Sequence, residues 1–364
     1  MLNGEIHSPS SPPAISNRFL TVDDHEMPPK RKAEKTEEGD VNAAANTLHS
    51  ESDGASKAPP PAKKTKSKVK EPVKPLDPTQ PTNKQLPDTL EEYDKGENIT
   101  RMACWNIAGY AASTRKGMHR YIQAEPADLL VLTETKVDKE PNDEVLKSSF
   151  KHSVWCGSQK KGYAGIAVLW NGEEAHSIET TLPTHPDQDS TRGRIITLEF
   201  EDKFVIGTYV PNAGQNLKAM DDKVAWNEAF KTYLHQLDAK KSVVWLGDLN
   251  VCHDSNDIRN DKSNWNKSAG WTETEVNGYK EQLSDKFVDA WKVLHPEATG
   301  QYTYWGYRFD ARVKGIGWRI DSCVVSKRLM ERVSDVVIRR EVYGASDHVP
   351  VCIDLRDADE HASK

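Results

Sequence analysis

The clearest pattern in this chain is a set of short apolar runs that each end in a polar residue. In the run at 242–250, SVVWLGDLN, five successive residues without polar side chains are followed by Asp248 and Asn250. A short apolar run bounded by turn signals predicts a buried strand. Polar groups buried out of water need partners. An acid and an amide at the end of such a strand therefore indicate a sheet edge that opens toward a ligand.

Similar runs predict further strands at 101–107, 128–134, 164–170, 194–200, 203–210, 319–326 and 349–355. Apolar residues at helical spacing predict helices at 114–125 and 217–239. The strands and helices do not alternate strictly. This order favours two packed sheets with helices outside them, an α/β fold.

Composition divides the chain near residue 97. Residues 1–97 hold 13 of the 20 prolines and no tryptophan, whereas all ten tryptophans follow residue 100. A segment so poor in apolar groups cannot bury enough surface to offset its chain entropy. We therefore expect a disordered, proline-rich tail at 1–97, one globular domain at 98–357 and a short C-terminal tail at 358–364.

The charge of the expected globular part is nearly balanced. From residue 98 onward the chain has 35 Lys and Arg against 39 Asp and Glu. This balance argues against a protein that coats nucleic acid non-specifically, although a nucleic-acid enzyme with a locally basic cleft is compatible with it. The five cysteines form no C-x-x-C pair, and no signal peptide or long apolar run is present. We expect an intracellular monomer with reduced, buried thiols and no membrane span.

Two short basic clusters lie in the expected tail, at 28–32 (PPKRK) and 63–70 (KKTKSKVK). Basic clusters in an accessible segment are typical of nuclear import signals. The alternative is a solvated tail of mixed charge without a signal. We expect a nuclear protein.

Polar residues that could carry chemistry recur at the strand ends: Asn106, Glu134, Tyr209, Asn212, Asp248, Asn250, Asp321, Asp347 and His348. Each alone has a structural explanation, such as a turn. Together they supply the hard oxygen ligands that suit Mg²⁺ or Mn²⁺, and no zinc-type Cys and His spacing is present. A histidine beside an acid can also orient a phosphate while a separate carboxylate activates water. The set predicts metal-assisted phosphodiester hydrolysis.

Nine blocks of the chain, in family order, resemble the exonuclease III family of apurinic/apyrimidinic (AP) endonucleases. They are WNIAG (105–109), LTETK (132–136), GYAG (162–165), YVPNAG (209–214), GDLNVCH (247–253), NKSAGWT (266–272), YTYW (302–305), GWRID (317–321) and SDHVP (346–350). Nine ordered blocks are a much stronger signal than one, and they cover about residues 99–356. The resemblance implies a four-layer α/β sandwich in which two mixed β-sheets are flanked by helices.

The same resemblance implies base-excision repair. The expected reaction is Mg²⁺-dependent hydrolysis of the phosphodiester 5′ to an abasic site in duplex DNA, with Mn²⁺ as an alternative ion. 3′-Phosphodiesterase and 3′–5′ exonuclease side activities are also expected. An abasic nucleotide is unstacked at little cost, which is one source of selectivity. Other repair proteins are the expected partners of the tail.

Site residues follow from the resemblance one by one. It implies metal binding by Glu134, Asn106 and Asp347, with Asp248, Asn250 and His348 as further ligand candidates. It implies catalysis by Asp248 on the attacking water, Asn250 and Tyr209 at the phosphate or leaving group, and His348 oriented by Asp321. It implies substrate contacts by Asn212 at the phosphate, by Tyr304, Trp305 and Trp318 around the extrahelical sugar, and by Gln215 and Arg308 on the duplex.

One position departs from the family pattern. The family usually has Asp or Asn where this chain has Ala108, and alanine cannot bind a metal. We therefore expect weaker metal affinity or a changed metal preference. Ala108 is also the one feature that favours an alternative reading as a weakly catalytic interaction protein, which Glu134, Asp248 and His348 argue against.

A second alternative is another phosphoesterase of the wider superfamily, such as a sphingomyelinase, an inositol-polyphosphate phosphatase or a deoxyribonuclease I-like nuclease. These share the Asp-x-Asn and Ser-Asp-His blocks. They usually place a histidine in the block where this chain has YVPN at 209–212. The WRID block at 318–321 favours the repair reading.

Overall fold

The computed structural model describes residues 74–76 and 78–357. One sheet contains β1 (Ile99–Asn106), β2 (Leu129–Thr133), β3 (His152–Cys156), β4 (Ile166–Trp170), β11 (Val333–Ile338) and β12 (Val351–Arg356). The other contains β5 (Ser177–Glu179), β6 (Ile195–Glu199), β7 (Lys203–Tyr209), β8 (Ser242–Asp248), β9 (Phe287–Asp289) and β10 (Asp321–Ser326). The strand orders are β11-β12-β1-β2-β4-β3 and β5-β6-β7-β8-β10-β9. Each sheet is mixed, because β1–β2 and β7–β8 are parallel and the other pairs are antiparallel.

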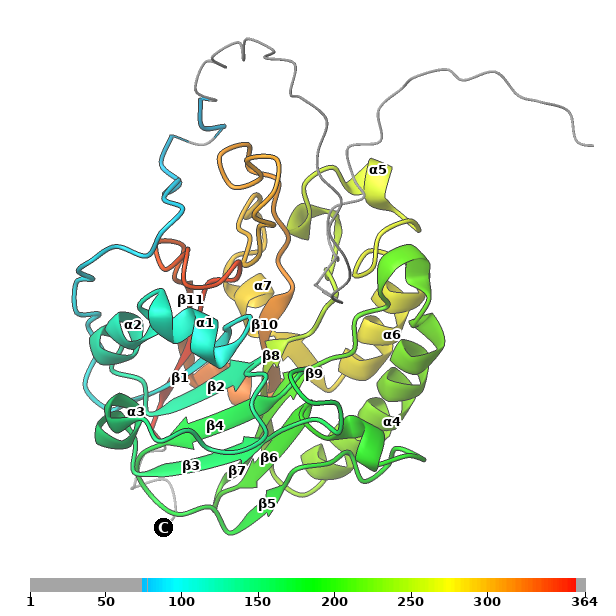
Figure 1. Ribbon diagram of the computed structural model, residues 1–364. Coiled ribbons are helices and arrows are strands. Elements are labelled where there is room, and N and C mark those ends of the chain that lie inside the picture. Colours follow the sequence, from blue (N-terminus) through cyan, green and yellow to red (C-terminus); the bar gives the residue numbers. More distant parts are fainter. Residues whose placement is uncertain (1–73, 77, 358–364) are drawn as a thin grey trace, which may run out of the picture. The chain divides into compact units, whose positions relative to one another are not determined.

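Helices connect the strands and cover the sheets (Figure 1). The α-helices are α1 (Tyr110–Arg115), α2 (Met118–Ala124), α3 (Glu144–Ser149), α4 (Met220–Asp238), α5 (Asp261–Asn264), α6 (Glu273–Leu283) and α7 (Ala290–Leu294). The short 3₁₀ helices are η1 (Asp189–Thr191), η2 (Gln215–Leu217), η3 (Ser255–Asp257) and η4 (Lys327–Arg332).

Alternating side chains on β8 show how the layers are built. Val244 and Leu246 belong to the apolar cluster between the two sheets. Val243 and Trp245 point to the other face and pack with residues of α4 and α6. On the outer face of the first sheet, strand residues pack with α2 and α3 in a third cluster. The four-layer sandwich expected from the sequence is confirmed.

All the strands expected from the apolar runs are present. Their observed ends differ from the expected ends by two residues or fewer. The helix expected at 114–125 is instead two helices, α1 and α2, because Gly117 between them has a φ of 97° in the left-handed region. Sequence reasoning did not find β3, β5, β9 and β11, nor the helices α3, α5, α6 and α7. Most of these elements are short, which leaves few residues from which to read a period.

Part of the expected tail packs against the sandwich. Residues 78–97 carry no helix or strand, yet Gln80 is 6% exposed and Leu86 is 4% exposed. Leu86 joins the apolar cluster beneath α2 and α3. The remainder of the expected tail, with the basic clusters at 28–32 and 63–70, and the C-terminal segment 358–364 lie outside the described residues.

The cysteines agree with the sequence-based expectation. All five are free and buried: Cys104, Cys156, Cys252, Cys323 and Cys352. Among the described residues, no helix combines the length and the apolar character that crossing a membrane requires.

The contribution of the N-terminal cap of α3 to stability can be tested at Asp143. Its side chain caps the helix by accepting hydrogen bonds from the N–H groups of Val145 and Leu146, and it also accepts from Tyr110 and His119. Burial alone would raise the pKa of Asp143, but these donors outweigh it and hold the pKa below its ordinary value. A lowered folded-state pKa contributes stability that is present above the unfolded value of about 3.9 and is lost as pH falls through the folded value.

We expect Asp143→Ala to lower the free energy of unfolding by about 1–2 kcal/mol at pH 7. The loss should shrink as pH falls below about 3.9 and through the lowered folded-state pKa, because the wild-type carboxylate then becomes protonated as well. Urea unfolding at pH 7 and across the acid range measures the difference. A loss that does not change with pH would show that the charge of Asp143 contributes nothing.

Candidate active site

The strand ends that the sequence singled out meet at one edge of both sheets. In the first sheet, Asn106 pairs with Thr133, so that Glu134 directly follows at the same edge. In the second sheet, Asp248 pairs with both Tyr209 and Asp321. The register of β1 with β2, and of β8 with β7 and β10, therefore places these polar residues level with one another at the ends of paired strands.

Asn106 links the two sheets at this edge. Its Nδ2 donates to Glu134 Oε1 at 3.0 Å and to Asp248 Oδ2 at 2.8 Å. Its Oδ1 accepts from the N–H of Ala108 at 2.9 Å. Asn106 is 1% exposed, so it fixes the distance between a carboxylate of one sheet and a carboxylate of the other.

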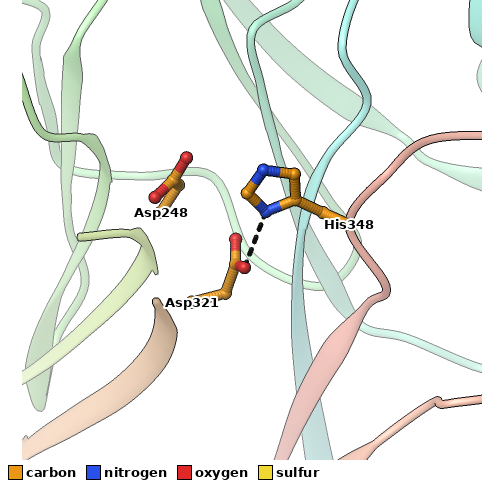
Figure 2. Close-up of side chains that lie close together, drawn as sticks. All are labelled: Asp248, Asp321 and His348. Atoms are coloured by element: carbon orange, nitrogen blue, oxygen red, sulfur yellow. Dashed lines mark hydrogen bonds and ion pairs between the residues drawn. The ribbon is translucent and has the colours of Figure 1, made fainter. Parts of the chain in front are cut away.

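Asp248, Asp321 and His348 form a compact buried cluster (Figure 2). Ligand atoms of the three residues lie within 4.8 Å of one another. His348 Nδ1 donates to Asp321 Oδ2 at 2.8 Å, and Asp321 Oδ1 has no hydrogen-bond partner among the described residues. The pairing of Asp321 with His348 leaves the second ring nitrogen of His348 available for a ligand.

The charges of this cluster shift one another strongly. Burial alone would lower the pKa of His348, but Asp321 and, more weakly, Asp248 raise it to about 10. Burial and the neighbouring Asp321 raise the pKa of Asp248 to about 7, although His348 and Asn106 oppose the rise. At neutral pH the histidine is therefore a cation, and Asp248 is close to the pKa that favours proton transfer.

Glu134 differs from Asp248 in its surroundings. Burial alone would raise its pKa, but Lys136, the Asn106 amide and His348 together hold the pKa below its ordinary value. Lys136 Nζ lies 3.2 Å from Glu134 Oε2. The side chain of Glu134 is therefore ionised at neutral pH, as a carboxylate must be to bind a metal ion.

Two amides lie together beside Asp248. Asn212 Nδ2 donates to Asn250 Oδ1 at 2.8 Å, and Asn250 Nδ2 donates to the Val210 carbonyl at 2.9 Å. The N–H of Asn250 donates to Asp248 Oδ1 at 2.9 Å. Asp248 and Asn250 therefore belong to one hydrogen-bond network, which places amide groups next to the carboxylate.

Tyr209 is half-buried at the end of β7. Burial, and after it the carboxylate of Glu134, raises its pKa well above the ordinary value, although Arg194 opposes the rise. The Arg194 guanidinium carbon lies 5.1 Å from the centre of the Tyr209 ring. The hydroxyl of Tyr209 therefore stays protonated at neutral pH and can act as a hydrogen-bond donor.

The predicted aromatic pocket residues differ in placement. Tyr304 lies against His348, with ring centres 4.8 Å apart, and forms backbone bridges to both His348 and Trp318. Tyr304 and Trp318 are half-buried. Trp305 is 0% exposed and packs edge-on against Tyr302 and Tyr343, so its ring lies in the interior and offers no surface to a ligand.

The two predicted duplex contacts stand apart from the hydrogen-bonded cluster. Gln215 begins η2 and Arg308 follows the aromatic block, and both side chains are exposed. Asp347 is half-buried next to His348, and burial raises its pKa.

Three basic residues at this edge were missed by sequence reasoning. Lys136 Nζ contacts Glu134 and donates to the Ala108 carbonyl at 3.1 Å. Arg194 stacks on Tyr209. Lys223 of α4 is 1% exposed, and its Nζ donates to the Asn250 carbonyl at 2.9 Å. Lys136 could have been noticed two residues after Glu134, whereas a lysine on an amphipathic helix normally predicts a solvent-facing position.

The donor set fits a hard divalent cation. Glu134, Asp248, Asp321 and Asp347 gather at one edge, and the raised pKa values of Asp248 and Asp347 show that their charged forms are disfavoured without added positive charge. Carboxylate and amide oxygens are the ligands that Mg²⁺ and Mn²⁺ prefer. Of the residues expected to hold an ion, Glu134 and Asp347 offer carboxylate oxygens, whereas Asn106 directs its amide nitrogen at Glu134 and Asp248 and its oxygen at the N–H of Ala108.

Two six-stranded sheets whose strand ends gather carboxylates, amides and a histidine define a metal-dependent phosphoesterase of the sandwich type. The chain matches the Endonuclease/Exonuclease/phosphatase family over residues 103–348 and belongs to that family.

Several known proteins are similar to it over most of its length. The chain is 36% identical to the DNA repair nuclease APEX1 of Danio rerio over 330 residues, which cover 90% of this chain and 99% of that protein. It is 35% identical to the DNA-(apurinic or apyrimidinic site) endonuclease of Dictyostelium discoideum, over 72% of this chain and 73% of that protein. An AP endonuclease structure from Archaeoglobus fulgidus superposes with a TM-score of 0.63 at 27% identity, over 71% of this chain and 100% of that chain.

Proposed function

We propose that this protein is a DNA-repair AP endonuclease that hydrolyses the phosphodiester 5′ to an abasic site in duplex DNA. The observation that carries the proposal is the cluster of Asp248, Asp321 and His348 at an edge where Asn106 joins Glu134 to Asp248. The relatives named for AP-site cleavage support the substrate class.

In this mechanism Asp248 accepts a proton from the attacking water. Its raised pKa of about 7 makes it a stronger base than an ordinary aspartate while leaving part of the population ionised at neutral pH. Asn106 and the N–H of Asn250 hold the two oxygens of the carboxylate in place. The water is therefore activated at a fixed position relative to the phosphate.

Developing negative charge on the phosphate is stabilised by fixed donors. His348, kept cationic by Asp321, directs its free ring nitrogen at a phosphate oxygen. Asn212 and Asn250 place amide groups beside it, and the protonated Tyr209 hydroxyl donates to the phosphate or the leaving oxygen. Preorganised donors of this kind supply the largest catalytic contributions.

A divalent ion, when bound, supplies Lewis-acid stabilisation of the phosphate and leaving group. We assign Mg²⁺, with Mn²⁺ able to substitute, to Glu134, Asp347 and Asn106. Asp248 and Asn250 would be further ligands of such an ion, and His348 would join them only in its neutral form, because the cation held by Asp321 has no free lone pair. Tyr304 and Trp318 form the wall that receives the extrahelical sugar, Trp305 supports that wall from behind, and Gln215 and Arg308 contact the duplex.

Ala108 provides a test of the metal assignment. Its φ of 51° lies in the left-handed region, which Asp and Asn adopt more readily than Ala. We expect Ala108→Asp to lower the Mg²⁺ concentration that gives half-maximal activity, because a carboxylate is added beside Asn106 and Lys136. A magnesium titration of both proteins measures this, and an unchanged midpoint would refute a role of position 108 in metal binding.

The mixed-charge N-terminal region is assigned to nuclear import and to contacts with other repair proteins, on the strength of its two basic clusters. The catalytic domain is assigned to 98–357, with residues 78–97 packed against it. The site needs no residue of a second chain, and a monomer stays the expectation.

A substrate panel separates the proposal from its alternatives. Duplexes with one abasic site, intact duplexes, sphingomyelin and an inositol polyphosphate are each incubated with the protein and Mg²⁺. We expect the abasic duplex alone to be hydrolysed rapidly. Hydrolysis of the lipid or the inositol phosphate without incision would favour another branch of the superfamily, and no hydrolysis at all would favour the interaction protein.

A further inference from the structure

A segment that composition assigns to the tail lies against the loops that form the active site. This segment, residues 78–93, is called the strap here. In Figure 1 it is part of the blue stretch that runs past α2. Its two ends are tied to different parts of the domain, since Gln80 Nε2 donates to the Arg312 carbonyl at 2.9 Å and the N–H of Tyr93 donates to the Ala124 carbonyl at 3.0 Å.

The strap packs closely on the loop that leads to His348. Asn83 Nδ2 donates to the Tyr343 carbonyl at 3.3 Å. Gly344 has a φ of 117°, and a Cβ atom at this position would lie 2.6 Å from backbone atoms of Gln85. Only glycine permits this approach. The backbone of the strap is therefore in direct contact with the chain four residues before the catalytic histidine.

A second route runs through Arg312. Its Nε donates to the Pro81 carbonyl of the strap at 2.8 Å. Its guanidinium carbon lies 4.3 Å from the centre of the Trp305 ring and 4.2 Å from that of Tyr343. A buried cation that lies against both rings favours one geometry for both. Arg312 therefore couples the position of the strap to that of Trp305.

Trp305 in turn connects two loops of the site, the one that carries Tyr304 and the one that carries Asp347 and His348. Its backbone N–H donates to the Asp347 carbonyl at 3.0 Å, and its backbone carbonyl accepts from the Tyr343 hydroxyl at 2.9 Å. It directly follows Tyr304, whose ring contacts His348. The buried position of Trp305 behind the pocket is what allows it to transmit a displacement of Arg312 to Tyr304 and Asp347.

We propose that the strap is a positioning element of the active site, which holds the loops carrying Tyr304 and His348 in their working geometry. The strap residues touch no reacting atom, so they act through Arg312, Trp305 and Gly344. This inference rests on the proposed function, because it assigns those loops to substrate binding and catalysis. Misplacement of a catalytic group by about 1 Å can cost about 100-fold in rate, so a partly loosened strap should be measurable.

The test compares two leucines of the same apolar cluster in the full-length protein. Leu86 of the strap and Leu146 of α3 are both 4% exposed and both belong to the cluster beneath α2 and α3. Leu86→Ala and Leu146→Ala remove the same atoms and should lower the melting temperature by similar amounts. At a temperature where both variants are folded, kcat/KM for the abasic duplex should fall about tenfold in Leu86→Ala and stay unchanged in Leu146→Ala.

Gln80→Leu gives a second test that leaves the apolar cluster intact. It removes the donor to the Arg312 carbonyl, and kcat/KM should fall in the same direction as in Leu86→Ala. Equal kcat/KM in Leu86→Ala, Gln80→Leu and wild type would overturn the proposal, as would an equal fall in Leu86→Ala and Leu146→Ala. Failure of the wild-type protein to cut the abasic duplex would instead refute the proposed function, so the two failures are distinguishable.

Discussion

Asp248→Asn is expected to lower kcat for incision of an abasic duplex by about 10²–10⁴-fold, the range of a lost general base. The amide has nearly the shape of the carboxylate but cannot take a proton from water. Asp248 is 1% exposed and its pKa is raised to about 7 by burial and by Asp321. Ionisation of this carboxylate opposes folding as pH rises from about 3.9 through about 7. The amide removes that cost but turns its NH2 group toward either Asn106 or the N–H of Asn250, so thermal unfolding at pH 8 in chelator is measured to establish that the variant is folded.

The measurement is single-turnover incision, together with thermal unfolding in chelator. Asp202→Asn is the matched control, because Asp202 precedes β7 at the end opposite Tyr209 and is exposed. Its kcat should equal that of wild type. A wild-type rate in Asp248→Asn would exclude Asp248 as the base.

Glu134→Gln is the second large effect that we expect. Glu134 stays ionised because Lys136 and Asn106 outweigh the effect of burial on its pKa. An amide keeps one oxygen but loses the charge, so the Mg²⁺ concentration for half-maximal activity should rise on the order of 10–100-fold or more. A magnesium titration of incision measures this shift, and saturating Mg²⁺ should restore part of the rate.

Glu144→Gln on the exposed first turn of α3 is the control for the loss of one carboxylate. Its titration midpoint should not move. If Glu134→Gln also kept the wild-type midpoint and lost only its maximal rate, Glu134 would be a catalytic group rather than the main ligand.

The two variants also separate the roles of two carboxylates that the sequence alone presents as equals. Both follow short apolar strands, and from the sequence both would be expected to be ordinary carboxylates with one negative charge at neutral pH. The structure gives Glu134 a lysine at 3.2 Å and gives Asp248 a second buried carboxylate as its strand partner. Opposite neighbours thus push the two pKa values apart, which is a common way in which active sites divide acid–base and binding roles.

Much of this site could be predicted because its residues sit at the ends of apolar strands. Apolar runs that are evident in the sequence end just before Asp248 and Glu134, and another begins just after Asp321. Pairing of the strands then places these residues at one edge. The two-sheet architecture was predictable for the same reason, since β8 and its neighbours are buried on both faces. Blocks in family order added the roles, which no periodicity supplies.

Other features depend on tertiary packing and leave no local signal. Trp305 follows the site residue Tyr304 in a loop. Nothing in the adjacent sequence shows that its ring is buried beneath Arg312. Lys223 is buried because it meets carbonyl groups at the end of β8, a contact between distant parts of the chain. Composition likewise assigns the strap to the tail, because a few buried residues such as Leu86 cannot change the average of a proline-rich segment.

The proposed activity is tested most directly by mapping the products formed from a duplex with one abasic site. We expect a single incision 5′ to the site, which leaves a 3′-hydroxyl and a 5′-deoxyribose phosphate, requires Mg²⁺ and is nearly abolished in Asp248→Asn. Incision that persists in chelator, cleavage on the 3′ side, or equal cutting of an intact duplex would contradict it.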